Sequence, residues 1–370
     1  MLTRSLSRTV RGVRAFAGVP SAIPSITLED GHKHPLLGYG TYKARRIPRA
    51  RIPRARAPRA ERERPRVDGA ARAQVGYVPP SASSAAAGAE AAGATADASA
   101  EPCVRDALAE GYRFIDCAEF YANEAEVGAA VADAAGTGVA RAELFLASKV
   151  WTTNIHAGES AVRAQVEKTL RELRTDYLDL YCVHWPVPGK HVAAYRALER
   201  LHDEGVIRSL GVSNYTVEDY SELAAACNVQ PQVNQIEVNP FLYRRETLAF
   251  FAAEGVAIQS YRTLRDGKAF ADPLLVGLGA KHGKSPAQVL ARWCTQKGVV
   301  AIAKSMKRER MRENAAIFDF ELDAEDMAKL DALTTPESLQ TFQELYRKCV
   351  VRDTPLAGTT EGVKMDITLH

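Results

Sequence analysis

The sequence lacks the features that mark membrane, zinc-finger and disulfide-rich proteins. No stretch of its 370 residues approaches the roughly 18 consecutive apolar residues that a membrane span needs, so we expect no membrane partner. The six cysteines form no CxxC pair, and none has a second Cys or His at finger spacing. We therefore expect free thiols and no metal site. Hydrophobic residues make up 46% and charged residues 25%, which is ordinary for a globular enzyme.

The net charge of +3 hides two strongly basic segments. Residues 1–20 hold four arginines and no acid, and residues 44–66 hold ten arginines against two glutamates. The rest of the chain is net negative. A nucleic-acid partner would need a basic footprint on a folded face. Because the positive charge is confined to these two segments, we expect no nucleic-acid role.

Residues 1–20 are typical of an organelle transit peptide. The segment is rich in Arg, Ser and Thr, and its apolar residues recur at helical spacing. We therefore expect a mitochondrial location, with a plastid or cytoplasmic location as the alternatives. A basic tail without a targeting role is the other interpretation of the segment.

Residues 44–100 have the composition of a disordered, low-complexity insertion. An IPRAR repeat places Pro every five residues, which excludes a helix or a central strand, and residues 79–100 are almost all Ala, Ser, Gly and Pro. Neither part can bury enough apolar surface to offset its ordering entropy. A partner-binding arm and translated non-coding sequence are the alternatives, because residues 41–43 and 75–80 would join as a plausible loop.

The remaining chain, 26–43 and 101–335, predicts an α/β fold, a (β/α)8 TIM barrel. An N-terminal hairpin is expected at Asp30-Gly31, a dipeptide that favours a type I′ turn. Eight short apolar runs then alternate with helical patterns, which implies parallel strands. The runs are 36–40, 113–118, 144–150, 177–185, 209–214, 233–238, 257–263 and 299–305. A doubly wound sheet is the rival, but no glycine-rich phosphate turn follows the first run. We expect residues 336–370 to form a C-terminal loop or tail.

Ionisable residues end three consecutive predicted strands. Asp116, Lys149 and His184 lie at these ends, and Tyr121 follows in the loop after Asp116. In a barrel, the carboxyl ends of the strands face the active site. An unperturbed Tyr has a pKa of about 10, and a nearby ammonium lowers it, so we expect Lys149 to bring Tyr121 toward the operating range. Asp116 would hold Lys149 in place.

The strings around these residues resemble the aldo-keto reductase family. They are GYRFIDCAEFYANEAEVGAA (111–130), LDLYCVHWP (178–186), GVSN (211–214) and AKSMKRERMRENAAIFDFEL (303–322). The resemblance implies NADPH-dependent reduction of a small aldehyde or ketone to an alcohol, with Asp116, Tyr121, Lys149 and His184 as the catalytic tetrad and Tyr121 as general acid. A non-catalytic NADP-binding subunit of another protein is the alternative. The sequence carries no oligomer signal, and we expect a monomer.

The resemblance also implies a set of binding residues. Cofactor contacts are expected from Thr41, Tyr42, Ser213, Asn214, Gln235, Tyr261, Arg262, Leu264, Lys304, Ser305, Arg310, Glu313 and Asn314. Among them, the resemblance assigns the carboxamide to Ser213, Asn214 and Gln235, the nicotinamide face to Tyr261, and the 2′-phosphate to Lys304, Ser305 and Arg310. Glu313 and Asn314 would hold the adenine. Independently of the resemblance, the end of the last predicted strand and the following helix carry a basic cluster that suits a phosphate: Lys304, Lys307, Arg308, Arg310 and Arg312. A solvated helix face is the alternative. Substrate contacts are expected from Tyr42, Trp151, His184 and Trp185.

One loop departs from the family pattern. Members usually follow the stacking Tyr with Ser-Pro-Leu, whereas this chain has Arg262, Thr263 and Leu264. The sequence therefore predicts either that Arg262 grips the cofactor phosphates directly or that cofactor binding is weak.

Overall fold

Eight parallel strands close into a barrel in the computed structural model, which describes residues 23–44 and 99–364. Around the barrel the strand order is β10-β3-β4-β5-β6-β7-β8-β9. The bounds are β3 Leu37–Gly40, β4 Phe114–Asp116, β5 Phe145–Val150, β6 Leu178–Val183, β7 Ile207–Ser213, β8 Val233–Glu237, β9 Ala257–Tyr261 and β10 Val300–Ala303. The predicted (β/α)8 barrel is confirmed, and each strand overlaps one of the eight predicted runs.

The pleat of β4 explains how a strand so short serves both the core and the site. Phe114 packs with Leu180 and Val233 inside the barrel, whereas Ile115 packs into the layer between the strands and the helices. Side chains alternate along a strand, so Asp116 returns to the barrel interior two residues after Phe114.

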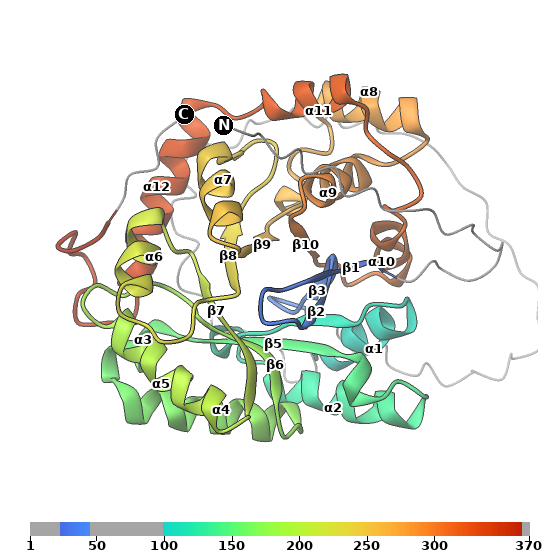
Figure 1. Cartoon of the computed structure of the whole chain (residues 1–370). Helices are drawn as coiled ribbons and strands as arrows, with labels where there is room; N and C mark the ends of the chain where they lie inside the picture. The colour runs from blue at the N-terminus through green and yellow to red at the C-terminus, as the bar shows by residue number, and fades with distance from the viewer. Residues whose placement is uncertain (1–22, 45–98, 365–370) are drawn as a thin grey trace, which may run out of the picture. The chain divides into compact units, whose positions relative to one another are not determined.

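Helices surround the strands, as Figure 1 shows. Their bounds are α1 Glu101–Ala109, α2 Glu124–Gly136, α3 Thr152–Ala157, α4 Glu159–Leu173, α5 His191–Asp203, α6 Val217–Ala224, α7 Arg245–Ala253, α8 Pro273–His282, α9 Pro286–Gln296, α10 Arg308–Ala315, α11 Ala324–Asp331 and α12 Pro336–Val350. Gly128 allows α2 to approach α4, because a Cβ there would lie 2.0 Å from the Glu172 carbonyl oxygen. None of the described helices combines the length and apolar character that a membrane crossing requires.

The N-terminal hairpin joins β1 (Ser25–Thr27) to β2 (Lys33–Pro35), as predicted. The expected two-residue type I′ turn is wrong, because a five-residue loop connects the strands and only its Gly31 has a positive φ, of 87°. A type I′ turn needs positive φ at both central residues. The hairpin closes one end of the barrel: Leu28 joins the interior cluster, and the His34 ring contacts Phe114 and Phe145.

Two predicted boundaries need correction. The insertion was expected over 44–100, but Ala44 and Ala100 are fully buried, with Ala100 directly preceding α1. The transit peptide and residues 45–98 lie outside the described part of the chain. Residues 336–370 were expected to be loop or tail, whereas Pro336–Val350 form the 15-residue helix α12. Thr335 caps this helix by accepting a hydrogen bond from the Ser338 N–H, and Pro336 occupies its first turn.

Candidate active site

The structure brings the four predicted catalytic residues together at the carboxyl ends of neighbouring strands. Asp116 ends β4, Lys149 lies near the end of β5, and His184 follows β6 directly. Tyr121 ends a short 3-10 turn that follows β4. Lys149 Nζ lies 2.7 Å from Asp116 Oδ1 and 3.4 Å from Tyr121 Oη. The rings of Tyr121 and His184 meet edge to face with centroids 6.1 Å apart.

Lys149 is a fully buried cation held by one charge and one dipole. Its Nζ donates to the Asp116 carboxylate and, also at 2.7 Å, to the Cys117 carbonyl oxygen. Burial, the largest single influence, opposes the ammonium form, but the charge and hydrogen bond of Asp116 together with the neighbouring Tyr121 and Cys182 outweigh it and raise the pKa of Lys149 above its usual range. Lys149 therefore stays charged at neutral pH.

Tyr121 departs from the expectation that Lys149 would lower its pKa overall. The residue is half-buried, and burial of its hydroxyl group raises the pKa of Tyr121 above its usual value, although Lys149 opposes the rise. Desolvation wins because the phenolate would lie in the barrel mouth, beside the Asp116 carboxylate. Tyr121 therefore keeps its phenol proton at neutral pH.

His184 is neutral. Burial, followed by the charge of Lys149, holds its pKa well below the usual range. Its Nδ1 is buried without a hydrogen-bond partner among the described residues, and its ring lies edge to face against Trp151, with centroids 4.9 Å apart. A neutral imidazole in this position can donate one hydrogen bond without adding a second positive charge to the site.

Four of the predicted cofactor residues form one hydrogen-bonded group at the carboxyl ends of β7, β8 and β9. Tyr261 Oη donates to Asn214 Oδ1 at 2.8 Å, and Asn214 Nδ2 donates to the His184 carbonyl oxygen and to Ser213 Oγ. Ser213 Oγ in turn donates to the Gln235 carbonyl oxygen at 2.9 Å. The sequence missed a further contact of Gln235, whose amide donates to Asp116 Oδ1 at 2.8 Å.

The predicted phosphate cluster at the end of β10 is only partly free to bind an anion. Two of its five basic residues, Arg308 and Arg312, are ion-paired with Glu110, a buried residue that directly follows α1. Within the described ranges, no acidic oxygen lies within 4.0 Å of the charged nitrogens of Lys304, Lys307 or Arg310.

The other predicted residues of this region support the backbone around the cluster. The Ser305 carbonyl oxygen accepts a 2.7 Å hydrogen bond from Tyr39 Oη, and the Ser305 side chain is buried. The Glu313 carbonyl oxygen accepts from Gln288 Nε2, and Asn314 is buried.

The loop after β9 takes an unusual backbone path. Arg262, Arg265 and Asp266 all have left-handed φ, of 51°, 49° and 55°. The Arg262 guanidinium pairs with the buried Glu237 at 3.0 Å and with Asp266 at 3.3 Å. A role for Arg262 on the cofactor phosphates would therefore require it to leave these acids. Leu264 packs against the hydrophobic core, and Thr41 Oγ1 donates to the Asp116 carbonyl oxygen at 2.9 Å, tying the end of β3 to β4.

Aromatic side chains wall one side of the tetrad. Tyr42, the most exposed of them at 45%, lies 5.1 Å from the Tyr121 ring, and Trp151 stacks on Phe120 at 4.1 Å between centroids. Trp185 meets Tyr346 of α12 edge to face at 5.6 Å. The helix α12 thus covers both tryptophans through one apolar cluster. Sequence reasoning missed this helix, although Thr335-Pro336 is a recognisable helix start.

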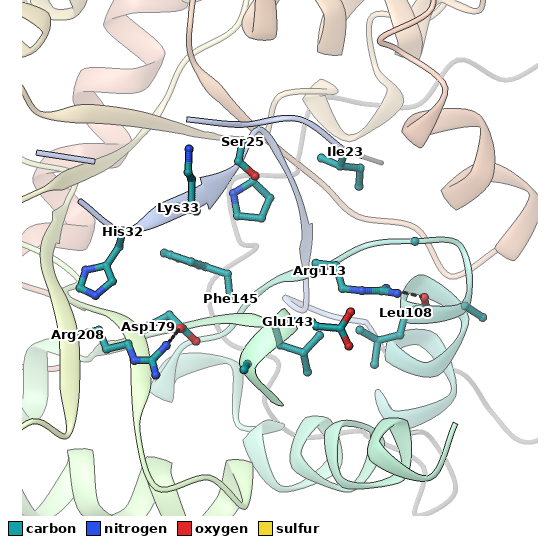
Figure 2. Close-up of a pocket in the computed structure, with 15 residues that line it drawn as sticks. Ile23, Ser25, His32, Lys33, Leu108, Arg113, Glu143, Phe145, Asp179 and Arg208 are labelled. Carbon is teal, nitrogen blue, oxygen red and sulfur yellow. Dashed lines mark hydrogen bonds and ion pairs between the residues drawn. The ribbon is translucent and has the colours of Figure 1, made fainter. Parts of the chain in front are cut away.

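A hollow lies at the end of the strands opposite to the tetrad. A cavity of about 680 Å³ is lined by the hairpin and by the amino ends of β4 and β5. Figure 2 shows two interactions within its lining, of Arg208 with Asp179 and of Arg113 with the Leu108 carbonyl oxygen. It is lined by none of the predicted catalytic residues.

The chain is similar to known proteins in both sequence and fold. The model of the Aldo/keto reductase family matches residues 84–335. A glyoxal reductase of Bacillus subtilis is 44% identical over 234 residues, covering 63% of this chain and 83% of that protein. A solved aldo/keto reductase of Brucella melitensis superposes with a TM-score of 0.66 at 32% identity, over 84% of this chain and 100% of that one. A Bombyx mori aldo-keto reductase in complex with NADP gives 0.67 at 26% identity, over 85% and 94%.

Proposed function

Because this chain belongs to the aldo-keto reductase family of oxidoreductases, we propose that it reduces aldehydes or ketones to alcohols with NADPH. One observation carries the proposal. A charged Lys149, locked to Asp116 at 2.7 Å, lies within hydrogen-bond reach of the protonated phenol of Tyr121. This is the arrangement that a proton donor for a carbonyl oxygen needs.

Each side chain has one part in the reaction. NADPH supplies the hydride, which no side chain can provide. Tyr121 donates its proton to the carbonyl oxygen, and the ammonium of Lys149 stabilises the phenolate that remains. Asp116 keeps Lys149 charged and in place. His184 donates a hydrogen bond from Nε2 to the same oxygen, since its Nδ1 has no partner that calls for the proton.

The basic cluster supports NADPH over NADH. Lys304, Lys307 and Arg310 have no acid within ion-pairing distance in the described part of the chain, so their charge remains available for a 2′-phosphate. Ser213, Asn214 and Gln235 supply amide and hydroxyl groups for the carboxamide, and Tyr261 supplies a ring beside them. The Bombyx mori relative was solved with NADP.

The substrate is a small carbonyl compound bound against the aromatic wall of Tyr42, Trp151 and Trp185. Glyoxal is the first assay substrate, because the 44% identical relative is named a glyoxal reductase. An aromatic aldehyde is the second, because it can stack on Tyr42, which is 45% exposed in the structure.

Tyr121→Phe tests the reaction directly. The variant keeps the ring and loses the proton donor, so carbonyl reduction falls by a factor of about 100 to 10,000 while NADPH binding is retained. NADPH oxidation at 340 nm gives the rate, and cofactor fluorescence gives the binding. Tyr195→Phe is the matched control, since its hydroxyl donates to the Val229 carbonyl oxygen far from the tetrad. Wild-type turnover by Tyr121→Phe would reject the assigned role. NADPH binding by the unmodified protein without any turnover would favour the non-catalytic subunit.

We also propose import into mitochondria and a monomeric state. The first rests on the composition of residues 1–20, which lie outside the described residues. N-terminal sequencing of the protein from isolated mitochondria checks it, because import predicts a mature chain that lacks this segment. Sedimentation analysis checks the second.

A further inference from the structure

A chain of buried hydrogen bonds runs from the catalytic carboxylate through the barrel to the hairpin that closes its other end. Gln235 Nε2 donates to Asp116 Oδ1 at 2.8 Å and to Gln259 Oε1 at 2.7 Å. Gln259 Nε2 lies 2.6 Å from His34 Nε2, and His34 Nδ1 lies 2.8 Å from the Pro35 carbonyl oxygen. All four side chains are at most 2% exposed.

The two ends of this chain fix the direction of every bond within it. The Asp116 carboxylate and the Pro35 carbonyl can only accept, so His34 must carry its proton on Nδ1 and accept at Nε2. Gln259 then presents its amide nitrogen to His34 and its oxygen to Gln235. Gln235 in turn has both amide hydrogens engaged, one of them on Asp116. If His34 carried its proton on Nε2, that proton would face the Gln259 nitrogen, and both glutamines would have to rotate. Gln235 would then turn its oxygen toward the carboxylate.

The surroundings of His34 keep it in this one state. Its ring lies among apolar side chains, edge to face with Phe114 at 4.7 Å and tilted against Phe145 at 4.1 Å between centroids. No ion pair of His34 is present in the described residues. Burial lowers the pKa of His34 to about 4, against the weaker effect of its hydrogen bonds, so the ring is neutral at neutral pH.

We propose that His34, on the hairpin at the far end of the barrel, is a positioning residue for carbonyl reduction: acting through Gln259 and Gln235, it fixes the hydrogen bond that Asp116 receives. The inference rests on the proposed reaction, because Asp116 acts on Tyr121 only through Lys149. Without the Gln235 bond, the carboxylate is more negative toward Lys149, and Tyr121 becomes a weaker acid. This role explains why a histidine lies among the apolar side chains at the end of the barrel that the hairpin closes.

The first experiment needs no turnover. In protein labelled with 15N at histidine, the ring signals that disappear in His34→Met belong to His34. We expect a neutral ring with its proton on Nδ1 at pH 7 that stays neutral down to about pH 5. A proton on Nε2, or a cation at pH 7, would overturn the proposed direction of the chain. This result stands apart from the proposed function, because an inactive wild-type enzyme would reject the reaction but not the hydrogen bonds.

The second experiment measures reduction against pH. His34→Met removes the nitrogen that accepts the hydrogen bond of Gln259. We expect kcat to fall about tenfold, the size of effect that follows from losing one hydrogen bond to a charged acceptor, here that of Gln235 to Asp116. The KM for the aldehyde should change little. The alkaline limb of the profile, where the rate falls with rising pH, should move to higher pH, because Tyr121 holds its proton more tightly. His34→Gln, which returns an acceptor to this position, should recover most of both. Phe145→Leu is the control for lost packing, because Phe145 contacts the His34 ring but lies outside the hydrogen-bond chain. It should lower the melting temperature and leave the alkaline limb at the same pH.

A second variant guards against misfolding of the first. Gln259→Leu breaks the same chain one step closer to Asp116 and should give the same shift. The double variant should have about the same kcat as either single variant, because both substitutions break the same hydrogen-bond chain. Additive effects, a wild-type profile for His34→Met, no recovery by His34→Gln, or an equal shift from Phe145→Leu would each overturn the proposal.

Discussion

Replacing Asp116 by Asn tests whether the buried ion pair is organised as we describe. The variant leaves the Lys149 ammonium with two neutral acceptors, the Asn oxygen and the Cys117 carbonyl oxygen, in a site that is fully buried. Removing one partner of a buried pair costs about 3–5 kcal/mol. We expect the lower end, about 3 kcal/mol at pH 7, because the amide oxygen can keep a hydrogen bond to Lys149. Carbonyl reduction should fall as well.

The pH dependence of this loss carries the sharper information. In the wild type, the folded-state pKa of Lys149 lies above the unfolded value, so its stabilising effect is full below that value and is lost only as pH rises through the folded pKa. In Asp116→Asn, burial loses its main opponent, and we expect the folded pKa of Lys149 to fall below the unfolded one. Between the two values the unfolded state binds more protons, so the variant gains stability with rising pH, by at most about 1.4 kcal/mol per pH unit.

Urea unfolding at pH 7 and 9 measures both effects as a difference between variant and wild type. Asp179→Asn is the matched control, because Asp179 pairs with Arg141 at 2.8 Å and with Arg208 at 3.3 Å. Arginine does not lose its proton in this range, so the loss in the control should be equal at the two pH values. An Asp116→Asn defect that is equally large at pH 7 and 9 would refute the reasoning.

Three further predictions address the cofactor, the insertion and α12. Replacing Lys304 and Arg310 together by Met should weaken NADPH binding roughly a hundredfold and NADH binding little, by loss of two charge-assisted contacts; equal affinities in the unmodified enzyme would contradict this. Deleting residues 45–74 should leave the melting temperature unchanged and the KM for NADPH equal or lower, since loop entropy grows slowly with length; an insoluble or inactive product would show that the segment has a structural role. Tyr346→Phe removes the 2.7 Å hydrogen bond to Asp219 and should lower the free energy of unfolding by about 1–2 kcal/mol, as measured in urea, whereas an unchanged value would mean that α12 is held by packing alone.

Much of the candidate site follows from the rule that the carboxyl ends of barrel strands face the active site. Asp116, Lys149 and His184 end consecutive strands, and the barrel brings them within reach of Tyr121 as predicted. Sequence reasoning had no means of finding Glu110, which pairs with Arg308 and so removes part of the predicted phosphate cluster. That pair joins residues 198 positions apart, and no local pattern encodes such a contact.

The sequence by itself determined the eight strands and the barrel, and it placed Asp116, Lys149 and His184 at strand ends, because periodicity and strand ends are local properties of the chain. Only the tertiary structure decided how those residues behave. Burial overrides Lys149 and raises the pKa of Tyr121, and α12 covers the tryptophans in place of the expected tail. It also decided that His34 meets Gln259, 225 residues away, inside the barrel. Desolvation and long-range hydrogen bonding depend on which segments the closed barrel brings together, and that arrangement is a property of the whole fold.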